Sequence, residues 1–465
     1  MQVGDILDDS TLDVATGSIE ITHVDIDSRT CVPGSLFFAM PGVSTSGLSY
    51  VKDAVANGAL CVVASEPVEF SVPVVVVPAT QLRALCAHAS ASVVGHPESK
   101  ASLVGVTGTN GKTSVTSLVA SLARGLSWNG ANIGTLTNER TTPAAPELFR
   151  TLATLVEAFD TAKDQSVVAM EVSSHAIDQR RVEGLRFAVA AFTNLSHEHL
   201  DYHGSMAAYY AAKASLFTNE HAQRAVIWTD DEYGAQLAAS TSLPVTRVSR
   251  DDATDVETSL KGTTFFWRHH LVNSALVGDY NVDNALTAMA IVSVLGADDD
   301  AIAAAMGEVP SIPGRFDVVR GPTVTVIVDY AHTPEALRRL LHDVRAMVPD
   351  GRIITVFGCG GDRDRAKRPE MGTVASTNSD VTIVTSDNPR SESPDAIIDE
   401  VISGVPDNVE VFRTPDRRAA ISQALALASL GDVVVVAGKG HETTQTTGDL
   451  VVAFNDRDVA KELMG

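Results

Sequence analysis

The sequence lacks the features of a membrane or secreted protein. It contains no stretch of about 18 uninterrupted apolar residues, the length that crosses a bilayer. Its first 30 residues, MQVGDILDDSTLDVATGSIEITHVDIDSRT, contain no basic segment followed by an apolar core, so no secretory signal is indicated. We therefore expect a cytoplasmic protein without membrane insertion.

Cysteine is also scarce. The four cysteines, Cys31, Cys61, Cys86 and Cys359, are scattered without C-x-x-C spacing. This distribution argues against a zinc site and against a disulfide framework. Reduced thiols in packed interiors are the simplest interpretation.

Positive charge is outweighed by negative charge. Lys and Arg number 35 against 58 Asp and Glu, which gives a formal net charge of -23. A protein that binds nucleic acid regardless of base sequence presents a basic face to the phosphate backbone. We therefore expect no nucleic-acid partner.

What the sequence does contain is a repeated alternation of short apolar runs with helix-like segments, from about residue 101 onward. This pattern is typical of parallel strands joined by crossover helices. The predicted strands form two series, VVAMEV (167–172), FAVAAF (187–192) and AVIW (225–228), then TVTVIV (323–328), IITVF (353–357), VTIVT (381–385) and VVVVA (433–437). Two separate α/β domains fit these series better than one large sheet.

A smaller mixed α/β domain is predicted ahead of them, because residues 1–98 carry shorter apolar runs, such as SLFFAM and CVVA, and the helical segment YVKDAVANGA. The segment VPSIPGRF (309–316) interrupts the apolar pattern with prolines and a glycine and indicates the second break. The predicted fold class is thus α/β with three domains. They are a small N-terminal domain (1–98), a central domain with a mostly parallel sheet (99–312) and a Rossmann-like C-terminal domain (313–465).

Polar and glycine-rich clusters follow the predicted strands immediately. TGTNGKT follows ASLVGV, DYAHTP follows TVTVIV, and GKGHE follows VVVVA. Ligands of open parallel sheets bind outside the carboxyl ends of the strands. We therefore expect both α/β domains to direct their functional side chains at a shared cleft.

The segment TGTNGKTS (107–114) predicts a phosphate-binding loop. Gly108 and Gly111 allow positive φ and bring backbone N–H groups close to a ligand, and the apolar spacing from Val115 to Leu122 predicts a helix that starts at the loop. Lys112 would then reach the outer phosphates and Thr113 would hold Mg²⁺. The full pattern G-x-x-x-x-G-K-[ST] would need glycine where this chain has Val106, so an ordinary strand-to-helix turn is the alternative.

Two nearby residues support a metal at this loop. Glu171 ends the next predicted strand, and His199 lies in the loop after the one beyond. Mg²⁺ prefers oxygen ligands and phosphate partners, and a carboxylate beside such a loop commonly completes its coordination. A paired acid and a hydrogen-bonded loop histidine are the alternatives for these two residues.

These and other segments of the sequence resemble the Mur ligases. The matching segments are GTNGKT (108–113), MEVSSHAIDQRRV (170–182), TNLSHEHLDYHG (193–204), YYAAKASLF (209–217), YNVDNA (280–285), PGRF (313–316), DYAHTP (329–334), GCGGDRDRAKRPEMG (358–372), DNPR (387–390) and GKGHET (438–443). They occur in family order and span nearly the whole chain. The shortened family loop G-T-x-G-K-T does not require glycine at Val106.

The resemblance implies an ATP-dependent amide ligase of peptidoglycan precursor synthesis. Its N-terminal domain would bind a UDP-sugar, its central P-loop domain ATP, and its C-terminal domain the amino acid, closing over the nucleotide. Within the family the segments resemble the ligases that add the third residue of the peptide stem. The implied reaction joins meso-diaminopimelate to UDP-N-acetylmuramoyl-L-alanyl-D-glutamate through an acyl phosphate, with ATP and Mg²⁺. We expect the protein to be a monomer.

The family roles for ATP and metal are carried over residue by residue. Thr113, Glu171, His199 and Lys213 match the metal ligands, with Lys213 carrying a CO₂-derived carbamate, and Lys112, Glu171, His199 and Lys213 match the catalytic group. The ATP contacts match Gly108, Thr109, Asn110, Gly111, Lys112, Thr113, Ser114, Asn284, Arg315 and Asp329. Without the resemblance, Lys213 in AAKASLF reads as a solvated helix lysine.

The substrate roles are carried over in the same way. The sugar-nucleotide contacts match Ser28, Val43, Ser44, Thr45, Thr141, Thr142, Ser173, Gln179 and Arg181, and the amino-acid contacts match Arg363, Asp387, Asn388, Pro389, Arg390, Gly438 and Glu442. Arg390 is the candidate that holds the second carboxylate of diaminopimelate through an arginine fork. Locally, the Thr pair before Pro143 could instead begin a helix, and DNPR could be a turn.

Two positions depart from the family pattern. Arg140 precedes the Thr pair where many relatives have Leu or Asn, and Glu198 stands where relatives usually carry Asp before the histidine. Three alternatives to the predicted function stay open. They are the same ligase using L-lysine or L-ornithine, a folate or natural-product ligase of the same fold, and a non-catalytic nucleotide-binding regulator.

Overall fold

The computed structural model describes all residues except 8–11, 43–44 and 139. The side chain of Asp201 is also excluded from the description. The chain forms two compact units. The first comprises Met1–Arg250 and Asn284–Ala305, and the second comprises Asp251–Asp283 and Met306–Gly465. The predicted domain boundaries at residues 98 and 312 stay a prediction.

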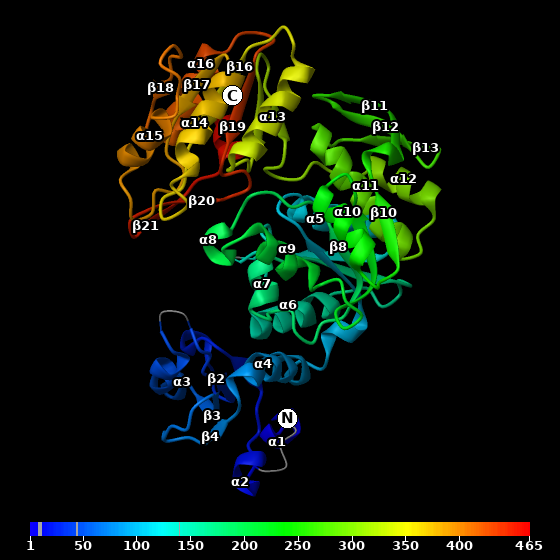
Figure 1. The fold of residues 1–465 in the computed structure, drawn as a ribbon, viewed down its shortest axis with the longest axis vertical. Helices are drawn as coiled ribbons and strands as arrows, with labels where there is room; N and C mark the ends of the chain where they lie inside the picture. The colour runs from blue at the N-terminus through cyan, green and yellow to red at the C-terminus, as the bar shows by residue number, and fades with distance from the viewer. Residues whose placement is uncertain (8–11, 43–44, 139) are drawn as a thin grey trace. The chain divides into compact units, whose positions relative to one another are not determined.

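The N-terminal part of the first unit has the predicted mixed α/β composition, and its small sheet is parallel (Figure 1). The sheet has the order β1-β2-β3-β4 and its core includes Leu36 and Cys61. Its elements are β1 (His23–Asp25), β2 (Ser35–Phe38), β3 (Ala59–Ala64) and β4 (Val74–Val76), with α1 (Val3–Leu7), α2 (Val14–Gly17), α3 (Val51–Ala56) and α4 (Ala79–Val93) and the short helices η1 (Ser28–Thr30), η2 (Gly47–Tyr50) and η3 (Pro97–Lys100).

The larger sheet of the first unit has six strands in the order β10-β9-β8-β5-β7-β6, all of them paired in parallel. Its central strands are buried on both faces, which explains why they appear as continuous apolar runs. The strands are β5 (Ser102–Thr107), β6 (Asn129–Ile133), β7 (Ser166–Glu171), β8 (Phe187–Phe192), β9 (Ala222–Trp228) and β10 (Val245–Val248). The helices are α5 (Lys112–Gly125), α6 (Ala145–Glu157), α7 (Ser174–Asp178), α8 (Leu200–His203), α9 (Met206–Ala214) and α10 (Glu232–Ser240), and η4 (Arg250–Asp252) follows.

The second unit contains the other six-stranded sheet, in the order β14-β15-β19-β16-β17-β18. It is parallel except at the edge strand β14, which pairs antiparallel with β15. The strands are β14 (Asp317–Arg320), β15 (Thr325–Asp329), β16 (Ile353–Phe357), β17 (Val381–Val384), β18 (Phe412–Arg413) and β19 (Val433–Ala437). The helices are α13 (Pro334–Met347), α14 (Lys367–Asn378), α15 (Pro394–Ile402), α16 (Arg417–Leu427) and α17 (Asp456–Met464), and β20 (Thr444–Thr447) and β21 (Leu450–Ala453) form a hairpin.

An antiparallel sheet in the second unit was not predicted from the sequence. Its strands are β11 (Ala253–Ser259), β12 (Gly262–Trp267) and β13 (His270–Ser274), and the helices α11 (Asp279–Val294) and α12 (Asp299–Gly307) follow. In β12, Phe265 and Trp267 are buried while Phe266 between them is 39% exposed. This alternation of faces is weaker as a sequence signal than the continuous runs of the parallel sheets.

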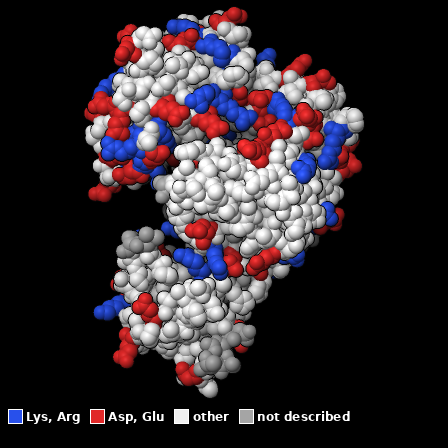
Figure 2. Space-filling model, in the orientation of Figure 1, with Lys and Arg blue, Asp and Glu red and all other residues white. Residues whose placement is uncertain are grey.

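The surface differs between elements (Figure 2). Acidic and basic side chains are interspersed over the second unit, whereas the area over α9 is largely uncharged. The exposed positions of α9 include Ala207, Ala208 and Ala211, and its lysine, Lys213, is buried. Among the described residues, no helix is long and apolar enough to span a bilayer.

Candidate active site

The loop between β5 and α5 has the geometry of an anion cradle. Gly111 precedes the first residue of α5, Lys112, with φ of 85°. A Cβ at Gly111 would collide with the carboxamide of Asn284, so only glycine fits there. The Lys112 Nζ donates to the carbonyls of Gly108 (2.9 Å) and Thr109 (2.6 Å), and the helix N-terminus opens onto the same loop.

A buried carboxylate lies beside this loop, at the end of β7. Glu171 is 2% exposed, and its Oε2 accepts a hydrogen bond from Thr113 Oγ1 at 3.0 Å. Its Oε1 accepts the backbone N–H of Thr135 at 2.8 Å, and a Cβ at Gly134 would clash with the carboxylate. A hydroxyl and a carboxylate at the start of a phosphate loop are oxygen donors of the kind that Mg²⁺ prefers, so the residues present fit this ion. The described residues contain no group of three or more His, Cys, Asp and Glu arranged to hold a metal by themselves.

Lys213 is buried, which rules out the solvated helix lysine that the local sequence suggests. It is 1% exposed, its Nζ donates to the Gly108 carbonyl at 2.8 Å, and it lies 4.6 Å from the centre of the Tyr209 ring. Burial lowers the pKa of Lys213 well below its ordinary value, and the charge of Lys112 lowers it further. α9 thus places an amine against the phosphate loop.

Tyr209 is a site residue that the predictions missed. Its hydroxyl lies 3.2 Å from Thr109 Oγ1, and its ring packs 6.0 Å from that of His199 and 5.1 Å from that of His203. The only sequence signal was its place in YYAAKASLF, one turn before Lys213 on the same helix.

His199 lies at the start of α8, in the left-handed conformation with φ of 57°. Its Nε2 is 3.8 Å from Glu198 Oε2, and its ring is 4.9 Å from that of His175. Desolvation lowers the pKa of His199 to about 4, although 43% of the side chain is exposed, and Glu198 opposes this shift. A neutral ring can donate a lone pair to a metal.

Most of the predicted sugar-nucleotide residues of the central sheet come together beside Glu171. Thr142 is buried and donates to the Glu171 carbonyl at 2.9 Å. Arg181 donates to the Thr142 carbonyl at 2.8 Å and to Gln179 Oε1 at 3.1 and 2.7 Å, and Ser173 Oγ accepts from Thr142 Oγ1 at 3.4 Å.

The alternative in which this Thr pair begins a helix is wrong. α6 starts at Ala145, its N-cap is Ala144, and no side chain caps it. Thr141 instead accepts a hydrogen bond from Thr135 Oγ1 at 3.3 Å. Both threonines therefore belong to the loop against β7.

The remaining predicted sugar contacts lie in the N-terminal part. Ser28 is buried and its carbonyl accepts from Asn57 at 2.8 Å, and Thr45 is exposed. Val43 and Ser44 lie outside the described residues.

In the second unit, the loops after β17 and β19 meet through Asn388. Its Nδ2 donates to Glu442 Oε2 at 2.7 Å, and Lys439 Nζ donates to the same Glu442 oxygen at 2.8 Å and to Asn388 Oδ1 at 3.3 Å. Lys439 is fully buried and was not predicted as a site residue, although it lies within GKGHET. Gly438, with φ of 112°, lies against the carboxylate of Asp387.

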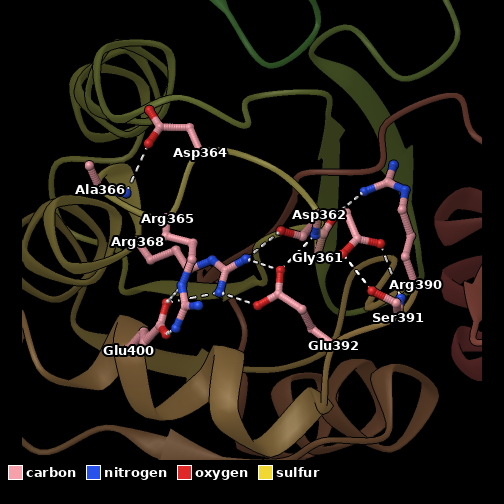
Figure 3. Close-up of polar contacts among 11 residues, drawn as sticks. Gly361, Asp362, Asp364, Arg365, Ala366, Arg368, Arg390, Ser391, Glu392 and Glu400 are labelled. Carbon is pink, nitrogen blue, oxygen red and sulfur yellow. Dashed lines mark hydrogen bonds and ion pairs between the residues drawn. The ribbon is translucent and has the colours of Figure 1, made fainter. Parts of the chain in front are cut away.

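Arg390 lies at the next corner of the same loop (Figure 3). Its backbone is left-handed, with φ of 51°, and it is bound to the β20–β21 hairpin through Thr446 (3.1 Å) and Gly448 (2.6 Å). Its Nη1 donates to the Gly361 carbonyl at 2.6 Å. Arg363, two residues further, is exposed. The structure therefore brings the predicted amino-acid residues of three loops into one neighbourhood of the second unit.

The predicted ATP residues divide between the units. Asn284 contacts the phosphate loop in the first unit, whereas Arg315 and Asp329 lie together in the second. Asp329 accepts from the Tyr280 hydroxyl at 2.8 Å and from the backbone N–H of Phe316 at 2.7 Å. Burial raises the pKa of Asp329, and the nearby Arg315 opposes this rise.

Comparison with known proteins decides the family. Residues 20–105 match the Mur ligase family, catalytic domain; residues 106–292 match the Mur ligase middle domain; residues 314–440 match the Mur ligase, glutamate ligase domain. The chain belongs to the Mur ligase family. The family resemblance and the α/β fold class predicted from the sequence are thereby confirmed.

Two relatives of this Mur ligase cover nearly its full length. A UDP-N-acetylmuramoyl-L-alanyl-D-glutamate–2,6-diaminopimelate ligase of Gloeobacter violaceus is 42% identical over 96% of this chain and 94% of its own. The protein of the same name from Geobacillus kaustophilus is 41% identical over 96% and 95%.

Solved structures agree in architecture. A ligase of the same name superimposes with a TM-score of 0.68 and 30% identity, covering 100% of this chain and 98% of its own. A folylpolyglutamate synthase of Mycobacterium tuberculosis in complex with ADP and AMPPCP, at 21% identity and a TM-score of 0.56, shares the fold and covers 76% and 91%.

Proposed function

We infer that this Mur ligase joins meso-2,6-diaminopimelate to UDP-N-acetylmuramoyl-L-alanyl-D-glutamate at the expense of ATP, in the cytoplasm and as a monomer. The observation that carries the inference is full-length identity of about 40% to ligases of that name, in a chain that retains the phosphate loop and the Arg390 loop. The domains 1–98, 99–312 and 313–465 would bind the UDP-sugar, ATP and the amino acid, respectively. Closure of the C-terminal domain over the nucleotide is part of the proposal.

The chain's own residues would bind and orient the ATP phosphates. The loop amides from Gly108 to Ser114 and the Lys112 ammonium neutralise phosphate charge, and Asn284, Arg315 and Asp329 contact the nucleotide. Thr113, Glu171, His199 and the modified Lys213 would hold magnesium, which supplies further charge neutralisation when bound. The proximity of Thr113 to Glu171 supports the first two ligands.

The reaction proceeds in two balanced steps. A carboxylate oxygen of the D-glutamyl residue attacks the γ-phosphorus of ATP, the bond to the bridging oxygen breaks, and ADP leaves. The neutral amine of the diamino acid then attacks the acyl carbon, phosphate leaves with the C–O bond electrons, and the amine loses a proton as the amide forms. Activation as an acyl phosphate is needed because an ammonium and a carboxylate are unreactive toward each other in water. The protein's contribution is mainly to position the reactants.

Lys213 would act as a carbamate. Its buried amine, held against the phosphate loop, can be capped by CO₂ with loss of a proton, which replaces a cation by an anionic oxygen ligand. The burial of Lys213 and the nearby charge of Lys112 both favour the neutral amine by lowering its pKa.

The substrates would occupy the two residue groups described above. Ser28, Val43, Ser44, Thr45, Thr141, Thr142, Ser173, Gln179 and Arg181 would bind the sugar nucleotide. Arg363, Asp387, Asn388, Pro389, Arg390, Gly438 and Glu442 would bind the diamino acid. The guanidinium of Arg390 suits the second carboxylate, which L-lysine and L-ornithine lack.

The direct test measures phosphate release with ATP, Mg²⁺ and the UDP-dipeptide. Diaminopimelate, lysine and ornithine are offered separately and in competition, and a folate acceptor replaces the UDP-dipeptide in one arm. We expect release that depends on diaminopimelate and on the UDP-dipeptide. If none of the mixtures releases phosphate although the protein binds nucleotide, the result would instead indicate a non-catalytic regulator.

A further inference from the structure

A fully buried arginine holds the loop that carries Arg390 (Figure 3). Arg368, at the start of α14, has a side chain that is 0% exposed. It donates to both carboxylate oxygens of Glu392 (2.9 and 2.8 Å) and to Glu400 Oε2 (2.8 Å), and its Nη2 also donates to the Gly360 carbonyl (3.2 Å). One guanidinium therefore joins the loop after β16, the loop after β17 and the helix α15.

Glu392, which is bound by Arg368, in turn binds the neighbouring backbone. Its Oε1 accepts the backbone N–H of Asp362 at 2.6 Å, and the Asp362 carboxylate accepts the N–H (3.2 Å) and hydroxyl (2.6 Å) of Ser391. Asp362 and Arg390 both have positive φ, 53° and 51°. Residues other than glycine keep this conformation only where the surroundings over-determine it.

The side chain of Arg390 ends at the same two segments. Its Nη1 donates to the Gly361 carbonyl, and the Gly361 N–H donates to the Asn388 carbonyl at 2.9 Å. Segments 360–362 and 388–392 are thus joined at both ends, by Arg390 on one side and by the pair Arg368–Glu392 on the other (Figure 3).

We propose that Arg368 is a positioning residue for diamino-acid recognition, which rests on the proposed function. Being fully buried, Arg368 acts through Glu392 and Gly360, which fix the backbone of Arg390 and present its guanidinium to the second carboxylate of the substrate. A planar fork with two parallel N–H groups specifies an orientation that a single ammonium does not. The charge and the geometry of Arg368 are therefore both required.

The test compares Arg368→Met, Arg368→Lys and Glu392→Gln with a matched control, Arg413→Met. Arg413 also bridges two carboxylates, Asp395 and Asp399, but on the exposed side of α15. We expect Arg368→Met to raise KM for diaminopimelate by about ten-fold or more, the size expected for a lost charge-assisted contact. kcat and KM for ATP should change by less than about two-fold, Arg368→Lys should give an intermediate KM, and Arg413→Met should match the wild type.

A readout without turnover separates this proposal from the proposed function. Hydrogen exchange of the amides of Asn388, Arg390, Ser391 and Glu392 should accelerate in Arg368→Met and Glu392→Gln, while the amides of β16 keep their protection. Wild-type protein that releases no phosphate with diaminopimelate refutes the proposed function alone. Unchanged hydrogen exchange in both variants overturns the positioning role. So does a lower kcat accompanied by an equal rise in KM for every substrate. If Arg368→Met does not fold, the hydrogen exchange of Glu392→Gln alone tests the positioning role.

Discussion

The two candidate sites hold their buried basic side chains in different ways. Beside the phosphate loop, Lys213 contacts a backbone carbonyl and an aromatic ring. Beside the loop of residues 388–392 that carries Arg390 (the amino-acid loop), Arg368 lies between Glu392 and Glu400. Burying a charge is costly unless an opposite charge or good hydrogen bonds accompany it, and the lowered pKa of Lys213 reflects that cost.

This difference indicates that the two sites are organised differently before a ligand binds. The phosphate loop presents cationic or neutral nitrogen groups whose hydrogen bonds and charge an anionic ligand would satisfy. The amino-acid loop is already neutralised internally, so its hydrogen bonds set a shape before the substrate arrives. Rigid preorganisation of this kind lowers the entropy lost on binding and sharpens the choice between similar substrates.

The largest effect is expected at the phosphate loop. Lys213→Ala removes the amine and any carbamate, so kcat should fall by at least about 100-fold, as for loss of a key electrostatic group. The fold should persist, because the contacts that the substitution removes are one hydrogen bond to the Gly108 carbonyl and the packing against the Tyr209 ring. Circular dichroism and steady-state kinetics check both points, with the exposed Lys52→Ala as control. An unchanged kcat removes the carbamate proposal.

A smaller and more selective effect is expected at the amino-acid loop. Arg390→Ala should lower kcat/KM for diaminopimelate by about 10- to 100-fold, the range for a lost charge-assisted hydrogen bond. KM for ATP should stay the same, and lysine, which has no second carboxylate, should be affected less. Equal losses with diaminopimelate and lysine would contradict the assignment of Arg390.

The ion pair between Arg368 and Glu392 should make the free energy of unfolding depend on pH in the acid range. The bonds from Arg368, followed by the N–H of Asp362, lower the pKa of Glu392 from 4.5 to about 2. A lowered carboxyl pKa stabilises the fold fully above the unfolded value, and this contribution is lost as the pH falls from about 4.5 to about 2. Urea unfolding across this range should show a shallower loss of stability in Glu392→Gln than in the wild type. If the free energy of unfolding fell equally with pH in Glu392→Gln and in the wild type, the stabilising effect assigned to ionised Glu392 would be contradicted.

The smallest effect is expected at the exposed arginine on the other side of α15. Arg413→Met breaks the pairs with Asp395 and Asp399, but solvent and salt screen such pairs. The thermal midpoint and all kinetic constants should stay within experimental error of the wild type. A change as large as that of Arg368→Met would show that burial is not what distinguishes the two arginines.

Much of the fold could be predicted because parallel strands buried on both faces leave continuous apolar runs. The predicted runs FAVAAF, IITVF and VVVVA coincide with β8, β16 and β19. The sheet β11–β13 was missed because its strands are half exposed, as the alternation at Phe265, Phe266 and Trp267 shows. Roles that depend on burial, such as those of Tyr209, Arg368 and Lys439, were missed for a related reason, since a residue type does not reveal its exposure.

The sequence by itself determined the α/β class and the family, because these depend on local periodicity and on motif order along the chain. It also predicts the phosphate loop from its turn residues. Only the tertiary structure decided that Lys213 is buried against Gly108, that Thr142 donates to the Glu171 carbonyl, and that Arg368 binds Glu392 near Arg390. Each of these contacts joins residues from different elements. Their energies depend on distance and desolvation, which arise only when the sheets bring those elements together.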